Sequence, residues 1–297
     1  MRIGIDLGGT KTEGVLLADS GEIVQRERRP TPVAEGYDAI LANIVTLVQR
    51  LERDAGGVCR IGIGAPGSIS RSNGLLHNSN TTCLNGRPLN RDLERLLARP
   101  IRLENDANCF VLSEALDGAA ADMEIVFGVI MGTGVGGGIA IRGRVHEGPQ
   151  RIAGEWGHNP LEPDGPACYC GRRGCVELFL SGAGLVREYG LQNGADRVLD
   201  AASITARAER GEPAAETALQ HFLGRFGRAL ATVINILDPH VVVLGGGLSG
   251  IRRLYTDGRA EVARHVFNEE FLTPIRPNLH GDSSGVRGAA QLWAPGE

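Results

Sequence analysis

The sequence lacks the features of a membrane, secreted or nucleic-acid-binding protein. No apolar run approaches the roughly 20 residues that a membrane-spanning helix needs, and the chain opens on a short strand-like run rather than a signal peptide. The net charge of -4 provides no basic surface for nucleic acid. We therefore expect a cytoplasmic protein with neither a membrane nor a nucleic acid as partner.

Glycine is the one residue type whose abundance stands out. The 297 residues suffice for two domains, and the hydrophobic (42%) and charged (22%) fractions are ordinary for a globular protein. The 43 glycines gather in short clusters at the ends of apolar runs. This distribution indicates backbone that lies close to a ligand rather than a flexible linker.

Three of the six cysteines follow a histidine within one short segment. Clustered cysteines in a reducing cytosol favour a metal site over the alternative, a disulfide with one free thiol. Three thiolates and one imidazole complete a tetrahedral zinc site with no open position, so the predicted zinc is structural. Its ligands would be His158, Cys168, Cys170 and Cys175, and it would hold the nearby carboxylates of Glu155 and Glu177 in place. We expect the remaining cysteines, Cys59, Cys83 and Cys109, to be ordinary buried thiols.

Three glycine turns, each following an apolar strand, are suited to a nucleotide phosphate. Glycine amides can approach phosphate oxygens, hydroxyls can donate, and Asp6 can hold magnesium directly or through water. The Walker sequence is absent, and the alternative for each turn is an ordinary tight turn. The nucleotide-binding residues predicted here are Asp6, Gly8, Gly9, Thr10, Lys11, Thr12, Gly132, Thr133, Gly134, Gly245, Gly246 and Gly247.

The pattern of strand, glycine turn and strand at residues 2–18 recurs at residues 125–141. This repetition predicts an internally duplicated α/β fold, with a boundary near residues 119–122. The expected domains are residues 1–119 and 120–282, and a C-terminal helix within residues 283–297 would pack back on the first.

Asp106 stands at the end of an expected strand, residues 101–104, just before an expected helix, residues 110–118. Open α/β sheets gather ligands at such strand ends, although a helix N-cap is the alternative role. We further expect helices at residues 37–53 and 92–97, strands at 60–65 and 241–244, and mostly helix over 181–236. The polar loop at residues 74–89, which contains Asn80, could bind sugar hydroxyls or simply be solvated.

Together these motifs resemble, in order and spacing, the ROK family of bacterial sugar kinases, within the actin-like, hexokinase-like ATPase superfamily. They are DLGGTK at residues 6–11, END at 104–106, GTGVGGG at 132–138, GEWGH at 154–158, CYCGRRGCVE at 168–177 and LGGG at 244–247. The resemblance covers essentially the whole chain. It implies two α/β domains that close over MgATP and a hexose, and usually a homodimer.

The resemblance also implies roles for individual residues. Asp106 matches the catalytic base, and the glycine turns match the nucleotide site. The matched sugar-binding residues are Asn105, Glu155, His158 and Glu177, to which we add Asn80. His158 would serve zinc with one ring nitrogen and the sugar with the other.

The choice of sugar rests on local resemblance to the fructokinase, or manno(fructo)kinase, branch. Residues 67–70, 78–80 and 156–159 carry it. They predict phosphorylation of fructose on its 6-hydroxyl, with N-acetylglucosamine kinase or glucokinase as alternatives.

A sugar-sensing ROK repressor is the alternative of another class. Such repressors carry a helix-turn-helix domain before the first motif, whereas here the strand that leads into this motif starts at residue 2, which favours the kinase. The presence of Asp106 with all three glycine turns argues against a non-catalytic sugar-binding module.

Overall fold

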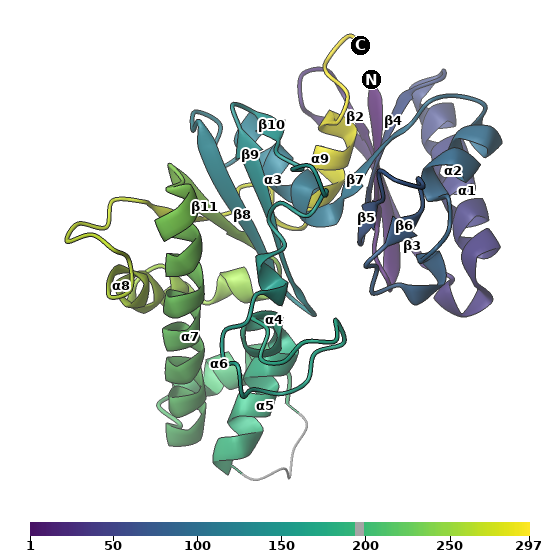
Figure 1. Ribbon diagram of the computed structural model, residues 1–297. Coiled ribbons are helices and arrows are strands. Elements are labelled where there is room, and N and C mark those ends of the chain that lie inside the picture. Colours follow the sequence, from purple (N-terminus) through teal and green to yellow (C-terminus); the bar gives the residue numbers. More distant parts are fainter. Residues whose placement is uncertain (194–198) are drawn as a thin grey trace. The chain divides into compact units, whose positions relative to one another are not determined.

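The computed structural model describes residues 1–193 and 199–297, which form two compact units of mixed α/β structure (Figure 1). Unit 1 comprises Met1–Asp122, Gly138–Ala153 and Leu279–Glu297, and unit 2 comprises Met123–Gly137 and Gly154–Asn278. Residues 138–153 thus group with unit 1, whereas the sequence pattern places them in the second domain. The reason is that β10 (Arg144–Val145) packs against α3 (Asp106–Leu116) of unit 1.

Unit 1 is built on a five-stranded sheet with the strand order β3-β2-β1-β4-β7. The strands are β1 (Arg2–Leu7), β2 (Lys11–Leu17), β3 (Ile23–Pro30), β4 (Arg60–Ala65) and β7 (Arg102–Asn105). β1 pairs antiparallel with β2 and parallel with β4, which places the carboxyl ends of β1, β4 and β7 at one edge. A separate small hairpin joins β5 (Ser68–Ile69) to β6 (Leu76–His77). Asp6 and Asn105 therefore share the ligand-gathering edge of the sheet.

Helices cover both faces of this sheet (Figure 1). The amphipathic α1 (Tyr37–Ala55) and α2 (Leu89–Leu97) close one apolar core over β1, β2 and β4. On the opposite face, α9 (Ser284–Gln291) lies directly against Gly4 of β1 and Gly62 of β4. A β-carbon at Gly62 would come within 1.8 Å of the carbonyl oxygen of Ala289, so only glycine lets this helix approach. α3 packs on α9 and completes the layer.

The second sheet has the order β10-β9-β8-β11-β12. Its further strands are β8 (Ile125–Met131), β9 (Val135–Ile141), β11 (Val241–Gly245) and β12 (Ile275–Pro277). β11 pairs parallel with β8 and β12, as β4 pairs parallel with β1 and β7. The two sheets thus share a pattern of pairing, which agrees with the duplication inferred from the glycine turns.

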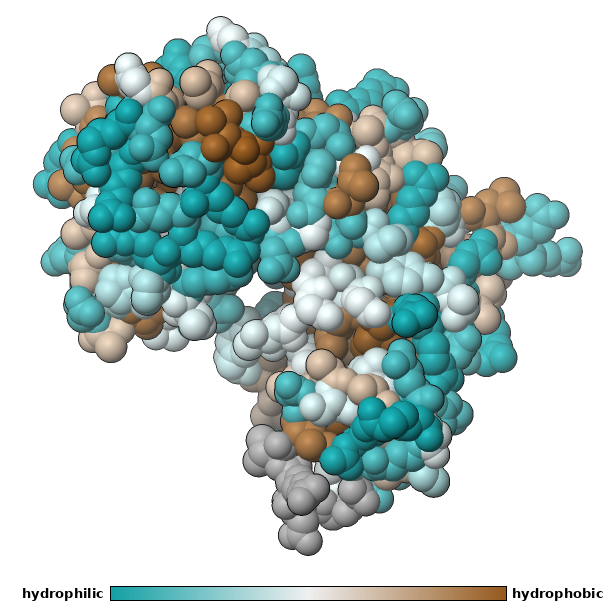
Figure 2. All heavy atoms as spheres, turned by 180° about the vertical axis from the view of Figure 1, so that it is seen from behind, coloured by the Kyte–Doolittle hydropathy of each residue, from teal (hydrophilic) through white to brown (hydrophobic). Residues whose placement is uncertain are grey.

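Five α-helices lie in the part of unit 2 that the structure describes. They are α4 (Glu177–Leu180), α5 (Gly182–Asn193), α6 (Ala201–Glu209), α7 (Pro213–Leu237) and α8 (Asp257–Ala263). The long α7 buries one face that runs from Ala215 to Ile234, begins with Pro213 and ends at a left-handed Asp238. α5, α6 and α8 all pack against it. The surface in Figure 2 is mostly hydrophilic with separate hydrophobic patches, as expected for helices that bury only one face.

Within residues 1–193 and 199–297, no helix combines the length and the hydropathy that crossing a membrane requires.

All six cysteines are free thiols. Cys59 and Cys109 are buried and Cys83 is half-buried, and burial raises the pKa of Cys109 well above its ordinary value. Cys109 is therefore a poor nucleophile.

Candidate functional site

The turn between β1 and β2 is the first of the three glycine turns predicted to bind phosphate. The amide of Gly8 donates to the carbonyl of Lys11 (3.0 Å), which tightens the turn and leaves Gly9, Thr10 and Lys11 exposed. Thr12 differs from the expectation of a phosphate-binding hydroxyl. Its side chain is fully buried, and its hydroxyl is hydrogen bonded to that of Thr31 (2.9 Å). The Thr12 side chain supports the turn and cannot itself reach a nucleotide.

Two carboxylates, Asp6 and Asp106, lie near each other within unit 1. Burial, together with the smaller effects of the charges of Asp106 and Glu13, raises the pKa of Asp6 to about 7. Burial also raises the pKa of Asp106, while hydrogen bonds from the start of α3 oppose that shift. A half-buried acid pair of this kind is suited to a bound cation or to a proton that moves during catalysis.

The N-cap of α3 is Asn105 rather than Asp106. The side-chain oxygen of Asn105 accepts from the amides of Ala107 (2.9 Å) and Asn108 (3.3 Å), and its Nδ2 donates to the carbonyl of Gly67 (3.2 Å). The helix therefore begins at Asp106, four residues earlier than its apolar run indicates. Asn105 thus supplies the cap, while Oδ1 of Asp106 accepts from the amide of Ala107 (2.9 Å), which fixes the carboxylate at the first turn of α3.

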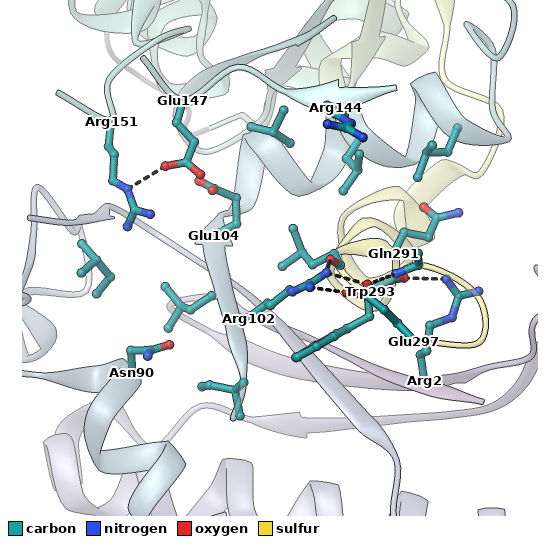
Figure 3. Close-up of a pocket in the computed structure, with 18 of the residues that line it drawn as sticks. Arg2, Asn90, Arg102, Glu104, Arg144, Glu147, Arg151, Gln291, Trp293 and Glu297 are labelled. Atoms are coloured by element: carbon teal, nitrogen blue, oxygen red, sulfur yellow. Dashed lines mark hydrogen bonds and ion pairs between the residues drawn. The ribbon is translucent and has the colours of Figure 1, made fainter. Parts of the chain in front are cut away.

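Glu104 supports this corner from the other face of β7. Its Oε1 accepts from the amide of Asn105 (2.8 Å) and from Nδ2 of Asn108 (2.9 Å), and burial raises its pKa. Figure 3 shows Glu104 beside Glu147 and Arg151, on the wall of a pocket of about 850 Å³ in unit 1. That lining includes neither Asn105 nor Asp106, so the pocket adjoins the start of α3 without containing these two residues. Sequence reasoning gave Glu104 no role.

Asn80 occupies an exposed position on a braced loop. Ser79 and Asn85 exchange two hydrogen bonds, from the Ser79 amide to Oδ1 of Asn85 and from Nδ2 of Asn85 to the Ser79 carbonyl, each 2.9 Å. Asn80 itself is exposed, while its neighbours Ser79 and Thr81 are buried. The loop thus presents the Asn80 side chain outward from a fixed backbone, as a ligand-binding loop requires.

In unit 2, the segment after Gly154 is anchored by Trp156. This side chain is buried, packs edge-to-face on Phe127 (5.8 Å between ring centroids) and donates from Nε1 to the carbonyl of Gly136 (3.4 Å). Its neighbours Glu155 and His158 are thereby held beside β8 and β9. Glu177, the first residue of α4, accepts from the amide of Val135 through Oε2 (3.0 Å). One oxygen of this predicted sugar ligand therefore also braces the turn between β8 and β9.

The predicted zinc ligands come together. The ligand atoms of His158, Cys168, Cys170 and Cys175 all lie within 4.8 Å of one another. Nδ1 of His158 lies 3.7 Å from Sγ of Cys168, and Sγ of Cys170 lies 3.6 Å from Sγ of Cys175. Zinc bond lengths of about 2.3 Å to sulfur and 2.05 Å to nitrogen give tetrahedral edges of about 3.6–3.8 Å. The donor set and its spacing therefore fit a four-coordinate zinc ion.

A second pocket, of about 800 Å³, lies within unit 2. Gly132, Thr133 and Gly247 line it, as the glycine turns predict, but Gly134, Gly245 and Gly246 do not. Gly246 instead has a positive φ of 78° and lies against the backbone of Met131. A β-carbon at this position would come within 2.4 Å of the Met131 carbonyl oxygen, so Gly246 is required for the shape of the turn. Most of the wall comes from α5 and α6, through Gly182, Ala183, Val186, Ala201, Ala202, Thr205, Ala206 and Glu209. This wall was not predicted from the sequence. The small residues at the starts of α5 and α6 were the feature of the sequence that could have indicated it.

The predicted site residues therefore fall into two groups. Unit 1 holds the turn at residues 8–12 with Asp6, Asn80, Asn105 and Asp106, and unit 2 holds the rest. Unit 1 offers half-buried acids with raised pKa values, whereas unit 2 offers a mostly apolar pocket bounded by glycine turns and a cluster of side chains that fits a metal ion.

The chain is similar over nearly its whole length to several known sugar kinases. The N-acetyl-D-glucosamine kinases of Yersinia pseudotuberculosis and Escherichia coli are 36% and 38% identical to this chain, and the alignments cover 98% of the chain and 98–99% of each relative. Among solved structures, the ROK hexokinase of Thermus thermophilus superposes with a TM-score of 0.85 at 33% identity, covering 97% of this chain and 96% of that one. A ROK family glucokinase from Streptomyces griseus, crystallised with glucose and AMPPNP, gives 0.82 at 28% identity and 99% coverage of both chains.

These likenesses confirm the expected actin-like, hexokinase-like ATPase fold. The ROK family profile matches residues 2–295, which is nearly the whole chain. This protein belongs to the ROK family.

Proposed function

We propose that the protein is an ATP-dependent hexose kinase in which Asp106 is the catalytic base. The observation that carries the proposal is the half-buried carboxylate of Asp106, with its raised pKa, at the first residue of α3, in a chain whose relatives are named as sugar kinases. A raised pKa makes a carboxylate a better proton acceptor near neutral pH than an ordinary aspartate.

The proposed chemistry is transfer of the γ-phosphoryl group of ATP to a sugar hydroxyl. Asp106 accepts the hydroxyl proton as the oxygen attacks phosphorus, and the amides of Gly9 and Thr10 and the pocket around Thr133 and Gly247 hold the nucleotide. Magnesium neutralises phosphate charge in such reactions, and Asp6 is the residue we assign to it, through water. Asn80, Asn105, Glu155, His158 and Glu177 would orient the sugar.

N-acetylglucosamine is the sugar that the comparisons favour. Relatives that cover nearly the full chain at 36–38% identity are named N-acetyl-D-glucosamine kinases, which supports this alternative over the fructose expected from local resemblance. Fructose is kept as the second candidate because residues 156–159 and 78–80 resemble the fructokinase branch, and both segments carry proposed sugar contacts.

Structural zinc and homodimer formation are further parts of the proposal. The spacing of the Cys3His cluster supports zinc, and metal analysis of the purified protein would test it.

Three exposed apolar side chains of unit 2, Ile236, Phe267 and Leu272, offer a surface for a second copy of the chain. Light scattering of the protein and of Phe267→Asp would test the dimer, since the charge should weaken it.

The kinase proposal is tested by a coupled assay for ADP release with N-acetylglucosamine, fructose, mannose and glucose. We expect N-acetylglucosamine to have the highest kcat/KM. Asp106→Asn should lose at least about 100-fold in kcat, which is the usual contribution of a general base, while calorimetry shows that sugar still binds. Asp38→Asn, an exposed residue of α1, is the matched control and should keep full activity. Unchanged turnover in Asp106→Asn would remove that residue from its role.

A further inference from the structure

Tyr169 contacts a residue of the predicted metal site but has no role in the proposal so far. Its hydroxyl lies 3.1 Å from Nε2 of His158, and the two rings pack edge-to-face with centroids 5.2 Å apart and an interplanar angle of 89°. The side chain is nevertheless 67% exposed. A large aromatic residue left in solvent, with its polar atom directed at a metal ligand, calls for a reason beyond packing.

The two ring nitrogens of His158 face different partners. Nδ1 points toward the sulfur cluster, 3.7 Å from Sγ of Cys168, and Nε2 points toward Tyr169. A histidine that binds a metal through Nδ1 carries its proton on Nε2, so Nε2 can donate to the oxygen of the phenol. The carbonyl of His158 accepts from Arg172 (3.3 Å). That bond holds the backbone, but it does not set the rotation of the ring.

We propose that Tyr169 is a positioning residue that holds the His158 ring in its metal-binding orientation while the sugar site is empty, and that a sugar hydroxyl replaces it at Nε2. The second half rests on the proposed function, because it assumes that His158 binds the sugar. The exposure of Tyr169 makes the exchange feasible, since the phenol can rotate into solvent without disturbing packed neighbours. His158 then keeps one acceptor at Nε2 in both states.

A hydrogen-bond partner of a metal-bound histidine typically contributes 10–100-fold to metal affinity. Loss of the phenol hydroxyl should therefore weaken zinc binding by about tenfold in the sugar-free protein. Bound sugar should restore the missing acceptor and recover most of the loss. By linkage, bound sugar should increase zinc affinity, and bound zinc should increase sugar affinity, by a larger factor in the variant than in the wild type.

The test compares Tyr169→Phe with the wild type, because this change keeps the ring and removes only the hydroxyl. Zinc affinity is measured by competition with a chromophoric chelator, without sugar and with saturating N-acetylglucosamine, and sugar saturation of the wild type is verified by calorimetry. Tyr37→Phe is the matched control, because it removes a phenol hydroxyl bonded to Asp92 (2.9 Å) in unit 1. Far-ultraviolet circular dichroism confirms that each variant is folded.

We expect sugar-free Tyr169→Phe to bind zinc about tenfold more weakly than the wild type. This difference in zinc affinity should become smaller when sugar is bound, and Tyr37→Phe should bind zinc as the wild type does. Equal zinc affinity of Tyr169→Phe and wild type without sugar would overturn the positioning role. A tenfold gap that persists at sugar saturation would overturn the exchange. If the wild type binds none of the four hexoses, the proposed function and the exchange both fail, and the sugar-free comparison still decides whether Tyr169 positions His158.

Discussion

Asp6 offers the sharpest test of the electrostatics in unit 1. Burial and the neighbouring charges of Asp106 and Glu13 raise its pKa from 3.8 to about 7. An acid with a raised pKa in the folded state stabilises the fold fully below its unfolded pKa, and that contribution is lost as the pH rises toward the folded pKa. In the absence of magnesium, stability should therefore fall between about pH 4 and pH 7.

The substitution Asp6→Asn removes this titration while keeping the size of the side chain. Each pH unit within the window changes the free energy of unfolding by about 1.4 kcal/mol. Between pH 5 and pH 8 the wild type should lose about 2–3 kcal/mol relative to the variant. The variant should thus be the more stable protein at pH 8, although it should lose magnesium-dependent activity if the proposed role of Asp6 holds.

The assay is urea unfolding at pH 5 and pH 8, in chelator-treated buffer. The protein has two tryptophans, Trp156 in unit 2 and Trp293 in unit 1. In a Trp156→Phe background, fluorescence then reports on unit 1 alone. Asp122→Asn, at an exposed surface position, serves as the control and should show no pH-dependent difference. The reasoning is refuted if Asp6→Asn and its parent change in parallel between the two pH values.

Three further predictions concern stability. The fully buried Glu114 side chain accepts hydrogen bonds from the amides of Ala119 (2.8 Å) and Leu279 (3.0 Å) and from the hydroxyl of Ser284 (2.7 Å). Because Glu114→Gln turns an NH2 group toward some of these donors, it should lower the free energy of unfolding in urea by about 2–3 kcal/mol. Gly62→Ala should lower the free energy of unfolding by about 3 kcal/mol or more, because its β-carbon overlaps α9. Gly57→Ala, with no atom within 4 Å of its β-carbon, should be nearly neutral, and equal effects of the two substitutions would contradict the packing argument. A strong zinc chelator should lower the melting temperature reported by Trp156 and not that reported by Trp293; equal shifts would show that the cluster does not stabilise unit 2 selectively.

The strands of the two sheets show how far periodicity alone can be trusted. β1, β4, β8 and β11 are almost fully buried apolar runs, and the sequence predicts each of them within about two residues. β3 was missed because half of Ile23–Pro30 is charged and most of it is exposed. It is a strand because β2 offers it a partner edge, and that is a long-range pairing that no local pattern reveals. The short edge strand β12 was missed for the same reason.

The candidate site divides in the same way. The zinc ligands were predicted because three thiols and an imidazole so close along the chain can surround one ion with only local folding. The start of α3 was misplaced because the cap depends on the side-chain oxygen of Asn105, which lies outside the apolar run. The small-residue wall from α5 and α6 was missed because small residues carry no chemical signature until folding brings them beside the glycine turns.

What the sequence determined by itself was the set of local structures, namely the buried strands, the glycine turns and the metal-binding segment, because hydrophobic periodicity, backbone freedom and ligand spacing act over a few residues. Only the tertiary structure decided that Thr12 is buried against Thr31, that one oxygen of Glu177 braces Val135, and that residues 138–153 group with unit 1. Those outcomes depend on strand order and on close packing between segments far apart in the chain, where a difference of one ångström decides which atoms can meet.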